Sequence, residues 1–149
     1  MKDSLVTYDR FLGGAVTVVQ PARGYRAGMD AVLLAASLSA KTGESLAEAG
    51  SGAGAALLCA VHRLEGCHFT GFERDSAAIT LAGQGIATNA FAAHADIRTH
   101  DIAERPSALE NVYDQSFSNP PFFDPTAIRA PAPGKANAFL ADTPLKAWI

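Results

Sequence analysis

Apolar residues in this sequence follow two spacings in turn, short runs that suit β-strands and longer runs that suit α-helices. The short runs predict strands at 45–49, 67–73, 95–99 and 112–118. The longer runs predict helices at about 31–40, 55–64 and 76–89. Residues 1–20 carry Val16, Val18 and Val19 and predict a hairpin or a single strand. Strands that alternate with helices in this way indicate an α/β fold with a mostly parallel sheet.

A glycine-rich turn, residues 50–54 (GSGAG), joins the predicted strand 45–49 to the helix that follows it. Such a turn lets a ligand approach the backbone and the N-terminus of the helix. Glu48 lies just before the turn, where a carboxylate is unusual for a buried strand and suits the ammonium group of a ligand. Glu73 ends the next strand, at the position where nucleoside-binding α/β folds hold a ribose hydroxyl.

The strand predicted at 112–118 runs into Asn119-Pro120-Pro121-Phe122. The two prolines stop the strand and stiffen the loop at its carboxyl end, where open α/β sheets bind ligands. The Asn119 side-chain oxygen and the Pro120 carbonyl could accept hydrogen bonds from an exocyclic amine, and Phe122 could stack on its planar group. The loop therefore indicates transfer to a planar nitrogen. The alternative is a proline-terminated strand followed by a buried phenylalanine.

Two further acidic residues each allow two interpretations. Asp30 is either the N-cap of the helix at 31–40 or, with Tyr25 and Arg26, part of a cofactor pocket. Asp101 follows the strand at 95–99 and either accepts from an adenine amino group or caps a turn.

Composition narrows the class of protein. With 149 residues, 48% of them hydrophobic and 18% charged, the chain suits one soluble domain. Its net charge of −3 gives no general basic field for nucleic acid, so RNA binding must come from a local site or a partner. The two cysteines and four histidines show no metal-ligand spacing. No apolar run suits a signal peptide or a membrane span, so we expect a cytoplasmic protein.

Three stretches carry a family resemblance: residues 20–34 (QPARGYRAGMDAVLL), 48–54 (EAGSGAG) and 118–125 (SNPPFFDP). In this order they resemble S-adenosylmethionine-dependent methyltransferases of the Rossmann-like class I. More closely, the chain is similar to the small-domain methyltransferases related to bacterial tRNA1(Val) adenine-N6-methyltransferase. The resemblance implies a three-layer α/β sandwich whose strands present here lie in the order 3-2-1-4.

The resemblance also implies roles for matching residues. The cofactor would be S-adenosylmethionine, with its methionine end on the glycine turn, its amino group at Glu48, its ribose at Glu73 and its adenine at Asp101. The Asn-Pro-Pro-Phe loop would hold the target amine in line with the sulfonium methyl, and no metal is needed. The candidate catalytic residues are Asn119, Pro120, Pro121 and Phe122. The candidate cofactor-binding residues are Tyr25, Arg26, Asp30, Glu48, Gly50, Gly52, Gly54, Glu73, Asp101 and Asn119.

The family fold has seven strands in the order 3-2-1-4-5-7-6, and this sequence supplies a pattern for the first four. After them, residues 126–137 predict a loop and a helix is expected from about Thr143. We therefore expect one domain over 1–149, incomplete at its C-terminal end, with 1–28 as an N-terminal extension. Its fourth strand would be an open edge through which a homodimer could form.

Other functions compete with this interpretation. An NAD-binding domain would explain residues 50–55 as a loose G-x-G-x-x-A pattern with Glu73 on the ribose, but it does not explain Asn-Pro-Pro-Phe. Loops of that kind also serve transfer to guanine N2 or to a glutamine amide. A cofactor-binding fragment without activity, or a generic α/β domain, is a further alternative. We expect an N-methyltransferase that acts on adenine in tRNA, with tRNA or another RNA as its partner.

Overall fold

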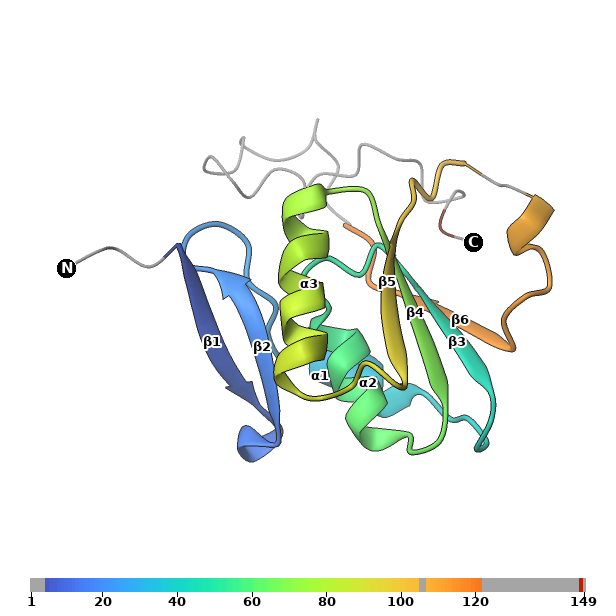
Figure 1. The fold of residues 1–149 in the computed structure, drawn as a ribbon, viewed down its shortest axis with the longest axis horizontal. Coiled ribbons are helices and arrows are strands. Elements are labelled where there is room, and N and C mark those ends of the chain that lie inside the picture. The colour runs from blue at the N-terminus through green and yellow to red at the C-terminus, as the bar shows by residue number, and fades with distance from the viewer. Residues whose placement is uncertain (1–4, 105–106, 122–147, 149) are drawn as a thin grey trace.

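The computed structural model describes residues 5–104, 107–121 and 148. These residues form a hairpin and a separate four-stranded sheet with three α-helices (Figure 1). The strands are β1 (Val6–Phe11), β2 (Val16–Pro21), β3 (Ser45–Ala49), β4 (His68–Glu73), β5 (Ala95–Thr99) and β6 (Gln115–Ser118). The α-helices are α1 (Met29–Ser37), α2 (Ala55–Arg63) and α3 (Ser76–Thr88), and the short 3-10 turns are η1 (Leu12–Gly14) and η2 (Ser107–Leu109).

The larger sheet is parallel, with its strands in the order β5-β4-β3-β6. This order confirms the predicted arrangement 3-2-1-4 of an α/β fold. Ala49 at the end of β3 lies opposite Phe72 of β4 on one side and Ser118 of β6 on the other. The segments that follow these three strands therefore open at the same edge of the sheet. They are the glycine turn, the Glu73 connection and the Asn-Pro-Pro loop.

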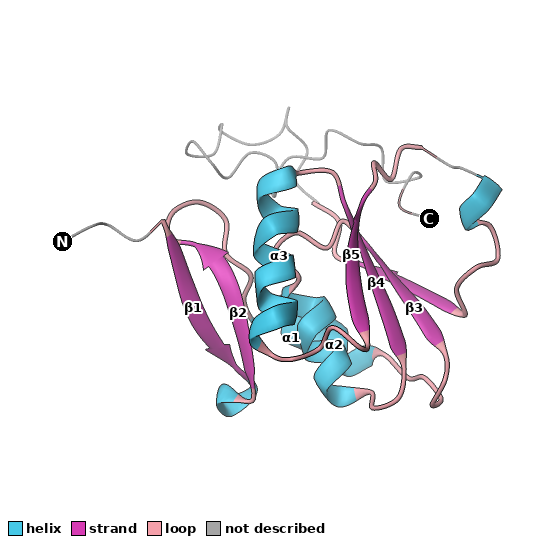
Figure 2. Ribbon diagram, in the orientation of Figure 1, coloured by secondary structure: helices cyan, strands magenta, loops and turns pink. Residues whose placement is uncertain are grey.

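The helices α1, α2 and α3 gather on one side of the sheet and bury its core there (Figures 1 and 2). Helix α2 has every residue from Ala55 to Val61 buried, because the sheet, α1 and the hairpin surround it. Leu46 of β3 and Phe69 of β4 supply the sheet's side of this core, and each is at most 2% exposed. The core thus fixes α2 directly behind the glycine turn. No helix in the described part of the chain is long and apolar enough to cross a membrane.

The N-terminal segment forms an antiparallel hairpin that packs on α3 and α2 instead of joining the larger sheet. Its Val16 and Val18 are fully buried. The side chain of Asn89, which caps the end of α3, accepts from the Thr17 N–H at 2.8 Å and donates to the Thr17 carbonyl at 2.7 Å. The amide therefore replaces a strand partner for β2, and it anchors the hairpin beside the domain.

Two predicted boundaries differ from the structure. Helix α1 begins two residues early, at Met29, and Gly28 is its N-cap. The prediction that Asp30 is the N-cap is therefore wrong, because Asp30 already belongs to the first helical turn. Strand β6 begins at Gln115 and not near residue 112. The side chain of Asp114, the residue before the strand, accepts from the Ser45 N–H at 2.8 Å and takes the place of a ladder carbonyl there. The helix expected from Thr143 lies outside the described residues.

Candidate functional site

A cavity of about 550 Å³ lies at the carboxyl ends of the strands, between the glycine turn and the segment before α1. Eight of the predicted site residues line it: Tyr25, Glu48, Gly50, Gly52, Glu73, Asp101, Asn119 and Pro121. Residues that are far apart in the sequence meet here because parallel strands end at a common edge. Phe122 lies outside the described residues.

The glycine turn is held by backbone hydrogen bonds to the neighbouring strand. Both the Gly50 and the Ser51 N–H groups donate to the Phe72 carbonyl, at 2.8 and 3.0 Å. Gly54 does not line the cavity: it is the N-cap of α2, with φ 79°, and a Cβ on it would lie 3.3 Å from the Cβ of Ala82. A packing role is thus observed for Gly54, in which a small residue lets α2 and α3 approach, and its contact with a cofactor stays a prediction.

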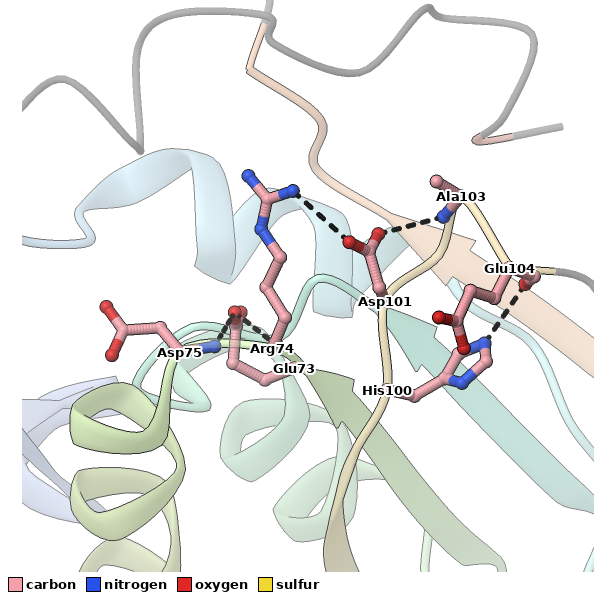
Figure 3. Close-up of polar contacts among 7 residues, drawn as sticks. All are labelled: Glu73, Arg74, Asp75, His100, Asp101, Ala103 and Glu104. Carbon is pink, nitrogen blue, oxygen red and sulfur yellow. Dashed lines mark hydrogen bonds and ion pairs between the residues drawn. The ribbon is translucent and has the colours of Figure 1, made fainter.

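Glu73 connects the glycine turn to the start of α3. Its carboxylate accepts from the Gly52 N–H at 2.8 Å. It also accepts from the N–H groups of Arg74 and Asp75 at 2.8 and 2.9 Å (Figure 3). A carboxylate has about four acceptor positions, so these three bonds leave about one for a ligand. The ribose contact stays a prediction, and the present role of Glu73 is to hold the turn.

Glu48 is a buried carboxyl with an unsatisfied oxygen. The residue is 3% exposed, it lies in the central strand β3, and its Oε2 atom has no hydrogen-bond partner among the described residues. Burial raises its pKa from the usual 4.5 to about 8; a hydrogen bond from the Leu57 backbone lowers it in part, and the charge of Glu73 raises it further. An orphaned buried oxygen is costly unless something satisfies it. A cationic group in the cavity would do so.

Asp101 caps a turn at the cavity rim. One oxygen accepts from the Ala103 N–H at 3.0 Å and the other lies 3.5 Å from Nη1 of Arg74, while the neighbouring His100 ring contacts the Glu104 carbonyl at 3.2 Å (Figure 3). The Ala103 hydrogen bond, followed by the positive charge of Arg74, holds the pKa of Asp101 below its usual range. The turn-capping alternative is thus observed, and the adenine contact stays a prediction.

A network of polar side chains fixes the segment before α1. Gln20 is 2% exposed; its Nε2 donates to Asp9 at 2.7 Å and its Oε1 accepts from the Ala27 N–H at 2.7 Å. The Arg26 guanidinium pairs with the same Asp9 carboxylate at 2.5 Å. Arg26 is not among the residues that line the cavity, and the hairpin carboxylate of Asp9 binds its side chain. Its contact with a cofactor stays a prediction.

At the other side of the cavity, the Asn119 amide contacts the start of α1. Its Nδ2 donates to Oδ2 of Asp30 at 2.7 Å, and the Tyr25 hydroxyl lies 3.5 Å from the same oxygen. Asp30 and Pro120 do not line the cavity themselves, although both were predicted at the site. The Asp30 carboxylate is thus hydrogen-bonded to Asn119 and Tyr25, and its contact with a cofactor stays a prediction.

Sequence reasoning missed several residues that line the cavity, among them Gln20, Arg74 and Trp148. The Trp148 ring lies directly over Gly50: a Cβ there would be 2.6 Å from Cη2 of the tryptophan. Gln20, a polar residue at the end of a valine-rich strand, gave a usable signal. Arg74 follows the acidic residue that ends β4 and could have been found by its position. No local pattern pointed to Trp148.

Comparisons with known proteins give a family match for the sequence and structural matches for the fold. The sequence model of the methyltransferase small domain matches residues 26–140, most of the chain. TYW2 of Pyrococcus horikoshii, solved in complex with MeSAdo, superposes with a TM-score of 0.62 at 18% identity, over 78% of this chain and 43% of that one. Another P. horikoshii protein, described as a transferase, gives 0.60 at 20% identity, over 75% and 42%.

A geranyl diphosphate methyltransferase in complex with GPP and sinefungin gives a TM-score of 0.55 at 21% identity, over 64% of this chain and 36% of that one. At these identities the structures support the fold alone. This chain spans less than half the length of each of the three. Comparison with curated protein sequences finds no significant match.

Proposed function

This chain belongs to the methyltransferase small-domain family, and on that basis we propose that it is an S-adenosylmethionine-dependent N-methyltransferase whose acceptor is an exocyclic amine of adenine in tRNA. The predicted α/β fold and the methyltransferase family are confirmed. The narrower relationship to tRNA1(Val) adenine-N6-methyltransferases stays a prediction. The observation that carries the proposal is that Glu48 and Asn119 face the same cavity from adjacent strands.

The residues on the β3 and β4 side fit S-adenosylmethionine. The cofactor carries a positively charged amino group, and the Oε2 atom of Glu48 is a buried acceptor with no partner in the part of the chain that the structure describes. A cation beside that oxygen would favour the ionised carboxyl and satisfy it. The backbone of the glycine turn and the remaining acceptor position of Glu73 offer further polar contacts for the rest of the molecule.

The residues on the β6 side fit an amine acceptor. When bound, S-adenosylmethionine supplies an electrophilic methyl group on a sulfonium. The chain's own contribution is to orient the nucleophile: Oδ1 of Asn119 and the Pro120 carbonyl would accept the two N–H bonds of a planar amine and stabilise the positive charge that develops there. A hydroxyl acceptor, with a single hydrogen, could not engage both groups.

That tRNA is the partner is also a proposal, and the net charge of the chain limits how tRNA could bind. A net charge of −3 gives no broad attraction for an RNA backbone. We therefore propose that a single tRNA nucleotide enters the cavity while additional protein segments or a partner hold the rest of the tRNA. A homodimer through the β6 edge stays a second, independent proposal.

The first test is calorimetric titration of the whole chain with S-adenosylmethionine. We expect saturable one-to-one binding. Absence of binding by a folded chain would overturn the proposal for this protein. Glu48→Gln is the better diagnostic variant than Glu73→Ala, because Oε2 of Glu48 holds nothing in the fold whereas Glu73 holds the turn.

The second test identifies the acceptor. Unfractionated tRNA and a bacterial protein extract are each incubated with the chain and methyl-labelled S-adenosylmethionine, and the products are digested to nucleosides or amino acids. Label in N6-methyladenosine supports the proposed acceptor. Label in N2-methylguanosine or in methylglutamine would replace it by one of the alternatives. In either case Asn119→Ala should bind the cofactor and transfer no methyl group.

A further inference from the structure

The contact between Asp30 and Asn119 joins two parts of the chain that are 89 positions apart. Asp30 lies in the first turn of α1, and Asn119 follows β6. Among the described residues, the side chains of these two segments are joined by a hydrogen bond in which Nδ2 of Asn119 donates to Oδ2 of Asp30 at 2.7 Å. An aspartate at this point of the helix also suits the positive end of the helix dipole.

The Asp30 carboxylate is itself fixed in place. Its Oδ1 accepts from the Gly28 N–H at 3.2 Å, and its Oδ2 lies 3.5 Å from the Tyr25 hydroxyl. Burial, followed by the charge of Asp30, raises the pKa of Tyr25, so the phenol stays protonated and serves as a donor. The carboxylate is thus held by two donors before it contacts Asn119, although Asp30 itself is exposed.

This contact selects one of the two orientations of the Asn119 amide. A carboxylate only accepts hydrogen bonds, so it attracts the NH₂ end of the amide and repels its oxygen. The NH₂ end therefore faces Asp30, and Oδ1 is left as the acceptor end, to which no described residue donates. Donation to an anion also polarises the amide, which makes Oδ1 a stronger acceptor.

We propose that Asp30 is a positioning residue for methyl transfer, which acts through Asn119 by turning the amide oxygen toward the target amine. The inference rests on the proposed function and extends it to a residue outside the cavity wall. Without Asp30 the amide would rotate, and half of its orientations would present NH₂ to an amine that has no need of a donor. The contact would otherwise be only a tether between α1 and the β6 edge.

The first experiment tests by NMR, without any reaction, whether Asp30 holds the Asn119 amide. The Nδ2 resonances of Asn119 are identified by their loss in Asn119→Ala and then followed in Asp30→Ala, Asp30→Asn and Glu65→Gln. Glu65 is exposed and remote, and its variant removes the same charge as Asp30→Asn. We expect the Asn119 signals to shift and exchange faster in Asp30→Ala, to shift less in Asp30→Asn, and to stay unchanged in Glu65→Gln. Unchanged signals in a folded Asp30→Ala would overturn the inference.

The second experiment compares cofactor binding with transfer to unfractionated tRNA. In Asp30→Ala the affinity for S-adenosylmethionine should stay within about twofold, because Asp30 does not line the cavity. The kcat should fall by about tenfold to a hundredfold at nearly constant KM, as expected when a reacting group is misplaced. Asp30→Asn, which keeps a neutral acceptor, should restore part of the kcat.

The outcomes distinguish this inference from the proposed function. A tether alone would lower the midpoint of unfolding and leave kcat unchanged in the folded variant, which overturns the positioning role. If the wild-type chain binds no cofactor or methylates no tRNA, the proposed function fails in the wild type itself. The NMR comparison then decides by itself whether Asp30 orients Asn119.

Discussion

The two sides of the cavity are built from different kinds of contact. The cofactor wall, which we define as Glu48, residues 50–53 and Glu73, is held by backbone N–H groups and by the register of adjacent strands. The acceptor wall, defined as Tyr25, Asn119 and Pro121, is held by side-chain contacts to Asp30, which lies behind it. The first contains the buried residues Glu48 and Ser51, whereas the residues of the second are half-buried and lie on the exposed Asp30.

Because of this difference, substitutions in the two walls should have different effects on stability and on function. The sheet register that aligns the ends of β3 and β4 builds the cofactor wall, so a change there disturbs the fold as well as the ligand. A change in the acceptor wall alters one or two side-chain contacts at the surface. The cofactor wall should therefore tolerate substitution poorly, and the acceptor wall should lose function before it loses stability.

The largest expected effect is that of Glu73→Ala, which removes the acceptor of three backbone N–H groups. At roughly 1 kcal/mol net for each hydrogen bond, the free energy of unfolding should fall by about 2–3 kcal/mol, and cofactor binding should be lost with the turn. Urea unfolding and calorimetry measure the two effects. Glu65→Ala is the control with the same charge change. A stable Glu73→Ala chain would mean that the turn holds without this carboxylate.

Glu48→Gln should separate ligand binding from folding within the cofactor wall. The substitution keeps the shape and replaces the partnerless Oε2 by an NH₂ group. At pH 8.5, where the wild-type carboxyl is largely ionised, loss of a charge-assisted contact should weaken S-adenosylmethionine binding by about 1.5–3 kcal/mol, roughly tenfold to a hundredfold. The free energy of unfolding at pH 7 should stay the same or rise slightly in Glu48→Gln. Equal affinity in both chains would exclude Glu48 as the site of the amino group.

The pKa of about 8 for Glu48 predicts a pH dependence of stability with a definite sign. Because the folded state keeps this proton more tightly than the unfolded state, the contribution of Glu48 is full below about pH 4.5 and is lost as pH rises through about 8. Between pH 6 and pH 8 the free energy of unfolding should decrease by about 2 kcal/mol. The same series on Glu48→Gln should lack this decrease, and two parallel curves would contradict the assignment.

The smallest expected effect is that of Asn119→Ala on stability. Its hydrogen bond with Asp30 is exposed, so the free energy of unfolding should change by no more than about 0.5 kcal/mol. Cofactor affinity should likewise be preserved, while transfer is lost. A loss of stability as large as that in Glu73→Ala would remove the distinction between the two walls.

The sequence predicted most of the fold because the apolar runs and the glycine turn are local signals. Strand β3 was predicted correctly despite the poor strand propensity of Ser45–Ala49, since the turn and the helix after it define its place. The same local signals could not show that Gly54 packs on Ala82 or that Glu73 already binds three N–H groups. Those facts depend on how α2 and α3 meet and on the path of the turn.

The acceptor wall was predicted less well because its contacts are non-local. The sequence predicted that Arg26 and Asp30 lie near a ligand. It did not predict that the Asp9 carboxylate of the hairpin binds Arg26, or that Asp30 accepts a hydrogen bond from the Asn119 amide. Side-chain pairs across 17 and 89 positions leave no periodic trace in one sequence. Gln20 and Arg74 line the same cavity only once the strands that carry them are assembled.

The position of Trp148 gives this protein a built-in optical probe. It is the single tryptophan of the chain, and its indole lies against Gly50 inside the proposed cofactor site. The emission of the whole protein under selective excitation therefore comes from one place, and a ligand that enters there changes the polarity around the indole. Occupancy could thus be followed by intrinsic fluorescence, with no label attached.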